Sequence, residues 1–292
     1  MGLIRLSIAL VTRDRPDWLQ RCLQSWRAQG VQPFEIIVSD DSCDALQTKM
    51  RQIAEHFGAR WIAGPQRGLY ANRNTAFRAA DGTHIMSADD DHTHPEGFVS
   101  AVVDAIESDI EAIWTVSERS PNRPTDPLEA LGELRSNGTI GPPENAEYSA
   151  AIACGSTAYP RKIFESGLYY DEAYRFGGMW YLWGHQLRKA GFRIRHCTET
   201  FVWHHTESSR PRQDDLQWLR HQLECNLFVQ VSHAFRISRN PVAMGAAKCR
   251  TAIAEWRNRH REQSQGPFAL WPSCSRLCVR IQKPFPAERV AL

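Results

Sequence analysis

The stretch HIMSADDDHTHPEGF, residues 84–98, decides how the rest of the chain is organised. A short apolar strand, Ile85–Met86, leads into three consecutive carboxylates, Asp89, Asp90 and Asp91. In an open α/β sheet, ligands bind outside the carboxyl ends of the strands. The stretch therefore predicts a buried strand that delivers acidic side chains to a ligand-binding edge.

These carboxylates are suited to a cation. Asp89 and Asp91 are two residues apart, so in an extended turn both can point to one side, with Asp90 on the other. Adjacent carboxylates repel each other unless a cation lies between them. Mg²⁺ and Mn²⁺ prefer such oxygens and often complete their coordination with substrate phosphates. The pattern indicates a metal–diphosphate site; the alternative is a solvated acidic turn that caps a helix beginning at Pro95.

The composition is that of a soluble globular protein. The 292 residues suffice for one large or two small domains, and 42% hydrophobic with 23% charged residues is typical of that class. No apolar run approaches the ~18–20 residues that span a bilayer, and we expect no signal peptide. The eight cysteines have no repeated spacing, which favours a reducing cytoplasm over a disulfide framework.

Strands alternate with helices along the chain. The apolar run Ile4–Thr12 is typical of a buried strand in a parallel sheet. Pro16 begins a helix whose apolar residues recur every three or four positions before Gly30. The same reasoning predicts strands at 34–38, 59–62, 85–86, 112–116, 150–159 and within 192–203, and helices at 46–57, 70–80 and 98–107. This alternation predicts a doubly wound α/β domain with right-handed crossovers.

A second strand also ends in carboxylates. The strand at 34–38 leads into Ser39, Asp40, Asp41 and Ser42. Carboxyl ends of parallel strands lie along the same edge. One acidic strand end could therefore hydrogen-bond a base or ribose while the other holds a metal.

Several motifs together resemble a known family. They are VTRDRPDWLQRCLQSWRAQ, EIIVSDDS, RGLYANRNTAFRAADG, the SADDD turn, ACGSTAYPRKIFESGLYYDEAYRFGG and LRKAGFRI. In this order and spacing, residues 4 to about 205 resemble an inverting family 2 glycosyltransferase with a GT-A fold. The resemblance implies a mostly parallel sheet flanked by helices. It also implies transfer of a sugar from a UDP- or dTDP-linked donor to an acceptor hydroxyl, with Mn²⁺ or Mg²⁺ as cofactor. The acceptor would be a saccharide, a lipid-linked molecule or a small molecule.

The resemblance assigns nucleotide and metal contacts to particular residues. The nucleotide and its phosphates would be contacted by Thr12, Arg15, Asp40, Asp41, Arg73, Asn74, Asp89 and Asp90. Asp89 and Asp91 match the DXD pair that binds metal and sugar diphosphate in the family. For Arg73 the alternative is a cation on a helix surface. In related enzymes a histidine after the last strand joins the metal or diphosphate, so His204 or His205 is a further candidate ligand through its neutral imidazole.

The chain departs from the family at its catalytic base. Met179 and Trp180 stand where the family has a Glu-Asp pair whose Asp deprotonates the acceptor. An inverting displacement needs a proton acceptor near the nucleophile, and neither side chain can serve. Three interpretations stay open: a substitute base among Asp171, Glu172 and His185, a weak or inactive member, or a different alignment of this helix.

Two tryptophans are candidates for acceptor binding. Trp180 and Trp183 are three residues apart, on one face of the predicted helix. Aromatic faces stack on sugar rings, so the pair could form an acceptor platform; ordinary core packing is the alternative.

The carboxyl-terminal part differs in character. We expect residues 1–210 to form the nucleotide-sugar and acceptor domain and residues 211–292 a helical extension with a basic tail. From Pro241 onward nine Lys and Arg stand against three Glu, a charge of +6, which with a total of +2 leaves −4 for the rest. Such a tail could dock peripherally on an anionic inner membrane face or be a disordered basic terminus. No RNA or DNA motif accompanies it, and we expect no nucleic-acid partner.

Two other functions compete with the transferase. A catalytically degenerate module that binds nucleotide-sugar without turnover would explain the missing Glu-Asp pair. A nucleotidyltransferase or dinucleotide dehydrogenase is disfavoured because no glycine-rich phosphate loop follows the first strand.

Overall fold

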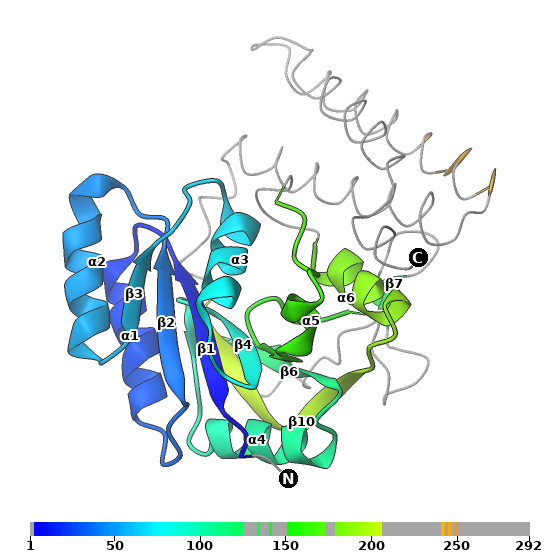
Figure 1. Ribbon diagram of the computed structural model, residues 1–292, viewed down its shortest axis with the longest axis horizontal. Helices are drawn as coiled ribbons and strands as arrows, with labels where there is room; N and C mark the ends of the chain where they lie inside the picture. The colour runs from blue at the N-terminus through cyan, green and yellow to red at the C-terminus, as the bar shows by residue number, and fades with distance from the viewer. Residues whose placement is uncertain are drawn as a thin grey trace.

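The structure is a computed structural model that describes residues 3–124, 133–134, 140–141, 151–172 and 179–205, together with 241–242, 245–246 and 249 (Figure 1). The predicted helical extension at 211–292 falls almost entirely outside these residues. Among the described helices, none is long and apolar enough to cross a membrane.

An eight-stranded sheet forms the centre of the described part of the chain. Its order is β3-β2-β1-β4-β9-β6-β10-β5. The bounds are β1 Leu6–Thr12, β2 Glu35–Asp40, β3 Arg60–Ala63, β4 His84–Asp89, β5 His92–Thr93, β6 Ile113–Arg119, β9 Thr157–Pro160 and β10 Ile194–His204. Neighbours β3, β2, β1 and β4 are parallel, as are β6 and β10, whereas β9 is antiparallel to both β4 and β6. The expected mostly parallel α/β sheet is therefore confirmed. A separate antiparallel pair is formed by β7 (Glu133–Leu134) and β8 (Ile140–Gly141).

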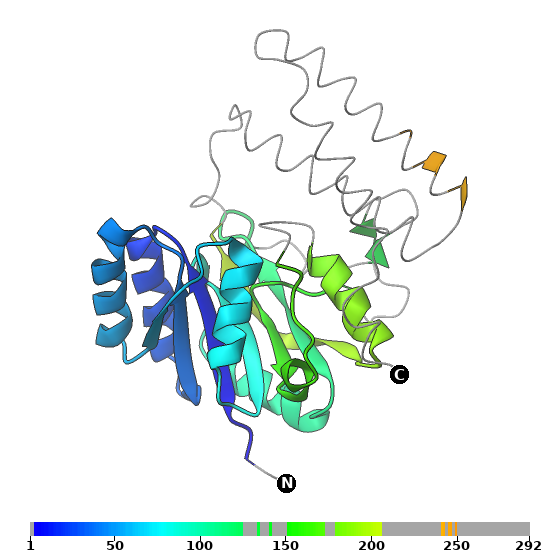
Figure 2. The same ribbon diagram turned by 45° about the horizontal axis from the view of Figure 1, so that its top comes forward.

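Helices cover both faces of this sheet, as Figures 1 and 2 show. One face carries α1 (Pro16–Arg27), α2 (Asp44–His56) and α4 (Phe98–Ser108). The other carries α3 (Leu69–Ala79), α5 (Lys162–Glu165) and α6 (Met179–Lys189). A sheet buried on both sides explains why its strands are nearly continuous apolar runs in the sequence.

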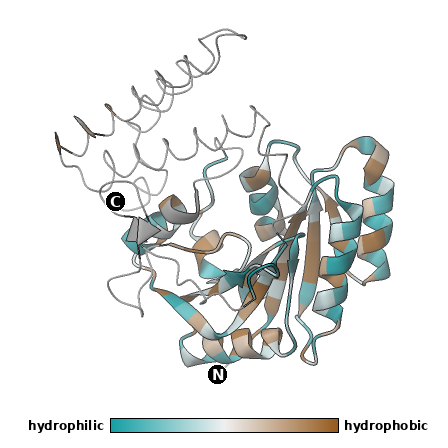
Figure 3. Cartoon of the chain, turned by 180° about the vertical axis from the view of Figure 1, so that it is seen from behind, coloured by the Kyte–Doolittle hydropathy of each residue, from teal (hydrophilic) through white to brown (hydrophobic). Residues whose placement is uncertain are grey.

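Strand β1 shows how the two cores are built. Leu6, Ile8 and Leu10 pack into the cluster under α1, α2 and α4, while Ala9 and Val11 pack into the cluster under α3, α5 and α6. Alternate side chains of a strand point to opposite faces, and burying each large aliphatic side chain contributes roughly 1.5–3 kcal/mol. Figure 3 shows the resulting concentration of hydrophobic residues in the central strands.

One predicted strand is shorter than expected. The sequence predicts strand from 150 to 159, but β9 begins only at Thr157, so the prediction is wrong over Ala151–Ser156. Hydroxyl groups hold this segment in a turn: Oγ1 of Thr157 donates to the Ala153 carbonyl at 2.6 Å, and the Ala153 amide donates to Oγ1 of Thr115 at 2.9 Å. Such side-chain bonds compete with a strand ladder. The turn places Cys154 and Gly155 against the end of β4.

Candidate functional site

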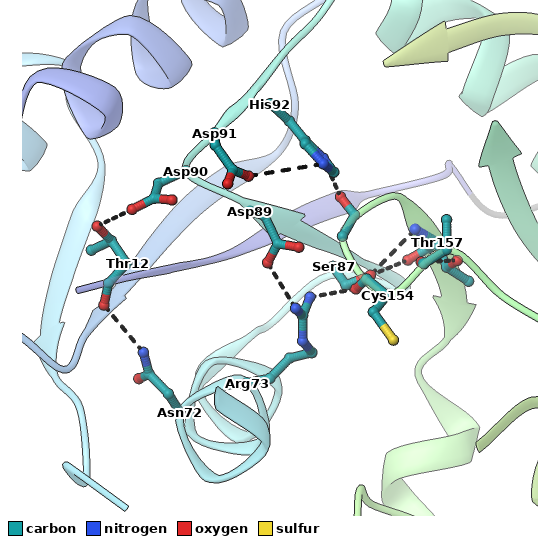
Figure 4. Close-up of polar contacts among 12 residues, drawn as sticks. Thr12, Asn72, Arg73, Ser87, Asp89, Asp90, Asp91, His92, Cys154 and Thr157 are labelled. Carbon is teal, nitrogen blue, oxygen red and sulfur yellow. Dashed lines mark hydrogen bonds and ion pairs between the residues drawn. The ribbon is translucent and has the colours of Figure 1, made fainter. Parts of the chain in front are cut away.

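Three parallel strands end side by side at the edge where the carboxylates lie. In the sheet, Thr12 at the end of β1 pairs with Asp40 at the end of β2, and Val11 pairs with Asp89 at the end of β4. The carboxyl ends of these strands therefore meet, as the sequence predicts. Figure 4 shows the polar side chains gathered there.

Asp90 points toward the first strand and is buried. Its Oδ2 accepts a hydrogen bond from Oγ1 of Thr12 at 2.7 Å and another from Nε of Arg15 at 3.1 Å, while its Oδ1 pairs with Nη2 of Arg15 (Figure 4 shows the Thr12 contact). Burial raises the pKa of Asp90 to about 7, against the opposing effect of Arg15. Asp90 thus ties the DDD turn to the loop after β1.

Arg15 bridges two of the three carboxylates. Its Nη1 donates to Oδ2 of Asp91 at 3.1 Å, in addition to its bonds with Asp90. Arg15 lies just before Pro16, and a proline disfavours helical geometry in the residue before it, so Arg15 stays outside α1 and reaches across to the turn. Its side chain is 31% exposed.

Asp89 is held by an arginine from the opposite side. Nη2 of Arg73, on α3, donates to Oδ1 of Asp89 at 2.7 Å, and its Nη1 contacts the Cys154 carbonyl (Figure 4). Arg73 is fully buried, so it is no surface cation. Burial raises the pKa of Asp89, but Arg73, His92 and His204 outweigh it and hold that pKa below its ordinary value. Asp89 is therefore an ionised carboxylate with a fixed orientation.

Asp91 faces two histidines. Its Oδ1 lies 4.0 Å from Nε2 of His92 on β5 and 4.0 Å from Nε2 of His204 at the end of β10. Ligand atoms of these three residues all lie within 4.8 Å of one another, which makes them a candidate metal centre in the described part of the chain. Asp89, predicted to share the metal with Asp91, does not belong to this group of three.

Glu118, at the end of β6, orients His204. Its Oε2 lies 2.7 Å from Nδ1 of His204. Burial lowers the pKa of His204, but Glu118, Asp91 and Asp89 outweigh it and raise that pKa to about 9. A metal that binds His204 would therefore displace a proton from this ring.

His205, the alternative histidine, is not part of this group of three. Its Nε2 lies 2.9 Å from Oγ1 of Thr93, and its ring packs against Trp18 with centroids 5.3 Å apart. Its backbone amide donates to the Asp91 carbonyl at 2.9 Å, which fixes the position of the turn. Of the two predicted histidines, only His204 belongs to the candidate metal cluster in the described part of the chain.

The acidic end of β2 is engaged in holding its own loop. Oδ1 of Asp40 accepts from the Ser42 amide at 2.9 Å, and Oδ2 accepts from Nε1 of Trp61 at 3.1 Å. Asp41 accepts from the Gln66 amide at 2.8 Å, and burial raises its pKa. Nucleotide contacts of Asp40 and Asp41 stay predictions, alongside these structural bonds.

Asn74 links α3 to the segment before α6. Its Nδ2 donates to the Tyr170 carbonyl at 2.9 Å and to Oε1 of Glu172 at 3.2 Å, and its Oδ1 accepts from the Tyr170 amide at 3.1 Å. The side chain is buried. Its role as a nucleotide ligand stays a prediction.

The candidate bases occupy different settings. Glu172 forms ion pairs with Arg67 at 2.8 Å and Arg78 at 3.3 Å, besides its bond to Asn74. Asp171 and His185 are both half-buried. The first turn of α6, which begins at Met179, contains no acidic residue, as the sequence predicts.

The two tryptophans cannot be treated alike. Trp183 is fully buried and packs on Tyr170 with ring centroids 4.9 Å apart. This position leaves no ring face open to a sugar. The side chain of Trp180 lies outside the described part of the structure.

Sequence reasoning missed His92, Glu118 and Gly155. His92 directly follows the carboxylates, and Glu118 is an acidic residue at a strand end, the same signal that identifies Asp40 and Asp89. A Cβ on Gly155 would lie 2.7 Å from Cγ of Asp89 and 2.8 Å from Cε1 of His92, so only glycine lets the turn approach the site this closely. No periodicity in the sequence reveals such an approach.

Comparison with protein families matches residues 7–168, more than half of the chain, to the family described as Glycosyl transferase family 2. Among curated proteins, none matches this chain in sequence.

Several solved structures share the fold at low sequence identity. GalNAc-T7 with UDP, GalNAc and Mn²⁺ is 17% identical, with a TM-score of 0.58, over 85% of this chain and 55% of that chain. TarS from S. aureus is 14% identical, with a TM-score of 0.57, over 98% of this chain and 50% of that chain. The mannosyltransferase PcManGT from Pyrobaculum calidifontis, in complex with GDP-Man and Mn²⁺, is 15% identical, with a TM-score of 0.57, over 96% of this chain and 86% of that chain.

The chain thus spans about half the length of the GalNAc-T7 and TarS chains. These likenesses confirm the expected GT-A fold. Together with the family match over residues 7–168, they establish that this chain belongs to glycosyl transferase family 2.

Proposed function

We propose that this glycosyl transferase family 2 chain transfers a sugar from a nucleotide-sugar to an acceptor hydroxyl, with a divalent metal ion at the carboxyl ends of its strands. The observation that carries the proposal is the convergence of Asp91 and His204, whose Oδ1 and Nε2 atoms lie 4.0 Å apart, beside the cation of Arg15. Carboxylate and imidazole groups that converge in this way are typical ligands of divalent metals.

The residues present fit such an ion. Asp91 and His204 would hold it, and once bound it would act as a Lewis acid that offsets charge on the leaving diphosphate. Arg15, whose side chain is partly exposed, would bind phosphate oxygens, and Arg73 keeps Asp89 ionised and oriented. The buried Thr12–Asp90 bond fixes the loop that carries Arg15.

The donor is proposed to be a UDP- or dTDP-linked sugar. Structures with this fold have been solved with UDP, with UDP-GlcNAc and with GDP-Man, which supports a nucleotide-sugar without choosing the base. We propose a saccharide, lipid-linked or small-molecule acceptor, as in the assembly of a polysaccharide.

Ligand-induced stabilisation tests the donor. The purified chain is heated with UDP, dTDP, GDP or CMP, each with and without Mn²⁺. A nucleotide that binds the native state raises the melting temperature, and we expect UDP or dTDP to do so only when Mn²⁺ is present. If no nucleotide stabilises the protein under either condition, the proposal fails.

The proton acceptor is proposed to be a substitute for the missing Glu-Asp pair. The candidates are Asp171, Glu172 and His185, of which Glu172 forms ion pairs with Arg67 and Arg78. Loss of a general base lowers turnover by ~10²-fold or more. Asp171→Asn and His185→Gln are compared with Glu172→Gln in turnover and in nucleotide binding. If all three variants retain wild-type turnover, the proposal that one of these residues is the substitute base is wrong.

A binding module is the second candidate function. It is favoured by one observation, the absence of an acidic residue from the first turn of α6. If the chain binds nucleotide-sugar with Mn²⁺ but neither transfers the sugar to an acceptor nor hydrolyses the nucleotide-sugar, this candidate replaces the transferase.

We also propose a peripheral contact between the carboxyl-terminal tail and an anionic membrane. The charge of +6 beyond residue 240 supports it, because basic segments are attracted to anionic lipid.

A further inference from the structure

Two histidines at the site each have one ring nitrogen fixed by a hydrogen-bond acceptor. Nδ1 of His204 lies 2.7 Å from Oε2 of Glu118, and Nδ1 of His92 lies 3.2 Å from the Gly155 carbonyl oxygen. A carbonyl or an ionised carboxylate can only accept, so in both rings Nδ1 carries the hydrogen. In the neutral ring, Nε2 then presents a lone pair.

Both Nε2 atoms face the same carboxylate oxygen. Each lies 4.0 Å from Oδ1 of Asp91, and the two rings meet edge to face with centroids 4.7 Å apart. A separation of 4.0 Å is too long for a hydrogen bond. Two atoms that bind one ion at ~2.1 Å each are separated by at most ~4.2 Å. The spacing therefore suits an ion placed between Asp91 and either histidine. Figure 4 shows Asp91 and His92 in this relation.

From this geometry we propose that His92 is a third protein ligand of the divalent ion, beside Asp91 and His204, and that Glu118 is a positioning residue for His204. This inference rests on the proposed function, which requires an ion at the strand ends but does not require these ligands. The family resemblance points to Asp89, Asp91 and a histidine after the last strand. His92 and Glu118 are identified only by their contacts in the structure.

The ligand set has a consequence for metal selectivity. Mg²⁺ prefers an all-oxygen octahedral shell, whereas sites that include imidazole favour transition metals, with affinity rising from Mn²⁺ to Co²⁺. Two imidazoles beside one carboxylate should therefore bind Co²⁺ more tightly than Mn²⁺, and Mn²⁺ at least ~10-fold more tightly than Mg²⁺.

Direct metal titration tests the ligands without recourse to activity. The metal-free full-length chain is titrated with MnCl₂, with and without UDP, while electron paramagnetic resonance reports free Mn²⁺. His92→Asn should weaken Mn²⁺ binding ~10–100-fold and reduce the preference for Mn²⁺ over Mg²⁺. Glu118→Ala should weaken Mn²⁺ binding ~10-fold. Glu118→Gln keeps an acceptor for Nδ1 of His204, so its Mn²⁺ affinity should stay close to that of the wild type. His56→Asn, at an exposed histidine on α2, is the matched control and should bind as wild type does.

A second measurement needs only the wild-type protein, because His92 is buried and its replacement could impair folding. Pulsed electron paramagnetic resonance of bound Mn²⁺ should detect two coordinating histidine nitrogens, assigned by ¹⁵N-histidine labelling. The inference is overturned if the wild type shows fewer than two. It is also overturned if folded His92→Asn keeps wild-type Mn²⁺ affinity and Mn²⁺/Mg²⁺ preference.

The outcomes separate this inference from the proposed function. A wild type that binds Mn²⁺ through two histidines but transfers no sugar would refute the transferase and keep the ligand set. A metal-dependent transferase whose folded His92→Asn variant binds Mn²⁺ normally would keep the function and refute the ligand set. If the wild type binds no divalent ion, with or without UDP, both fail.

Discussion

Asp91 is the residue on which the two sides of the site converge, because it accepts from Arg15 and faces both histidines. Asp91→Asn preserves the shape of the side chain but removes its charge. We expect Mn²⁺-dependent UDP binding to fall at least ~100-fold, since loss of an anionic ligand exceeds typical effects of outer-sphere changes. Calorimetric titration with UDP in the presence of Mn²⁺ measures this affinity. Asp104→Asn, at an exposed position on α4, is the control. Unchanged affinity in Asp91→Asn would place the metal elsewhere.

Gly155 permits the close approach of its turn to Asp89 and His92. In Gly155→Ala the added Cβ would lie 2.7 Å from Cγ of Asp89 and 2.8 Å from Cε1 of His92. Overpacking of this kind costs about 1–3 kcal/mol of unfolding free energy, and displacing the two side chains should also weaken Mn²⁺ binding. Urea unfolding and Mn²⁺ titration measure both effects. Gly30→Ala, where a Cβ meets nothing within 4 Å, should change neither; equal behaviour of the two variants would contradict the prediction.

At the residue scale, the sequence predicts the acidic side chains of the site better than their partners. Asp40 and Asp89 are recognisable because each ends an apolar strand at the same edge. Glu118 and His204 lie 86 positions apart, and their pairing depends on β6 lying next to β10 in the sheet. That adjacency is a property of the strand order, so no local pattern could reveal it.

Helix α3 illustrates the same limit at the scale of an element. Its position at 70–80 is predicted within one residue, since the structure has Leu69–Ala79. Yet Asn72, Arg73 and Asn74 are three consecutive polar residues and all are buried, which a helical hydrophobic pattern would not predict. Their partners are Ser39, Asp89 and Tyr170, from three other segments. Tertiary hydrogen bonds, rather than hydrophobicity, bury this face of the helix.

Asn74 provides a test of that conclusion. Asn74→Ala would leave the buried amide and carbonyl of Tyr170 without the bonds that Asn74 makes to them. Leaving one such group unsatisfied costs about 1–3 kcal/mol. We therefore expect the free energy of unfolding to fall by at least the cost of one group, about 1–3 kcal/mol. Thr75→Ala on the same helix removes only a bond to the Ala71 carbonyl within α3 and serves as the control. Equal stability of the two variants would show that the link between α3 and Tyr170 contributes little.

At the scale of the whole molecule, the alternation of strands and helices is enough to predict an α/β sheet covered on both faces. It does not predict that β9 inserts antiparallel between β4 and β6, because the strand order depends on contacts between distant segments. The insertion brings the end of β6, with Glu118, and the end of β10, with His204, to the metal side of the site. The sheet order therefore places Glu118, which sequence reasoning did not find, next to His204, which it did.

The uneven charge of the chain leads to a prediction about membranes. If the basic tail docks on anionic lipid, sedimentation with phosphatidylserine-containing vesicles should fall steeply as salt rises, because exposed charges are screened over ~8–10 Å at 0.1–0.15 M. A chain that ends at residue 240 should not sediment, and neutral vesicles are the control. Absent or salt-independent sedimentation of the full chain would favour a tail with no role at membranes.

The last prediction concerns acid stability and uses His84, which begins β4 away from the metal ligands. His84 is buried, its Nε2 donates to the Ile110 carbonyl at 3.0 Å, and burial lowers its pKa, with a further contribution from Lys162. The unfolded chain therefore binds a proton at this residue more readily than the folded chain does. By linkage, this neutral histidine contributes stability that is fully present above the unfolded pKa of ~6.5 and is lost as the pH falls toward the lower folded pKa.

Denaturant unfolding between pH 5 and pH 7.5 measures this loss. His84→Gln keeps an amide donor for the Ile110 carbonyl but cannot titrate, so its free energy of unfolding should decrease less with acidification than that of the wild type. The exposed His56→Gln, on α2, corrects for a generic loss of one histidine. If His84→Gln and wild type lose stability in parallel from pH 7 to pH 5, His84 is not the source of acid sensitivity. The charge distribution around the sheet would then have to account for it.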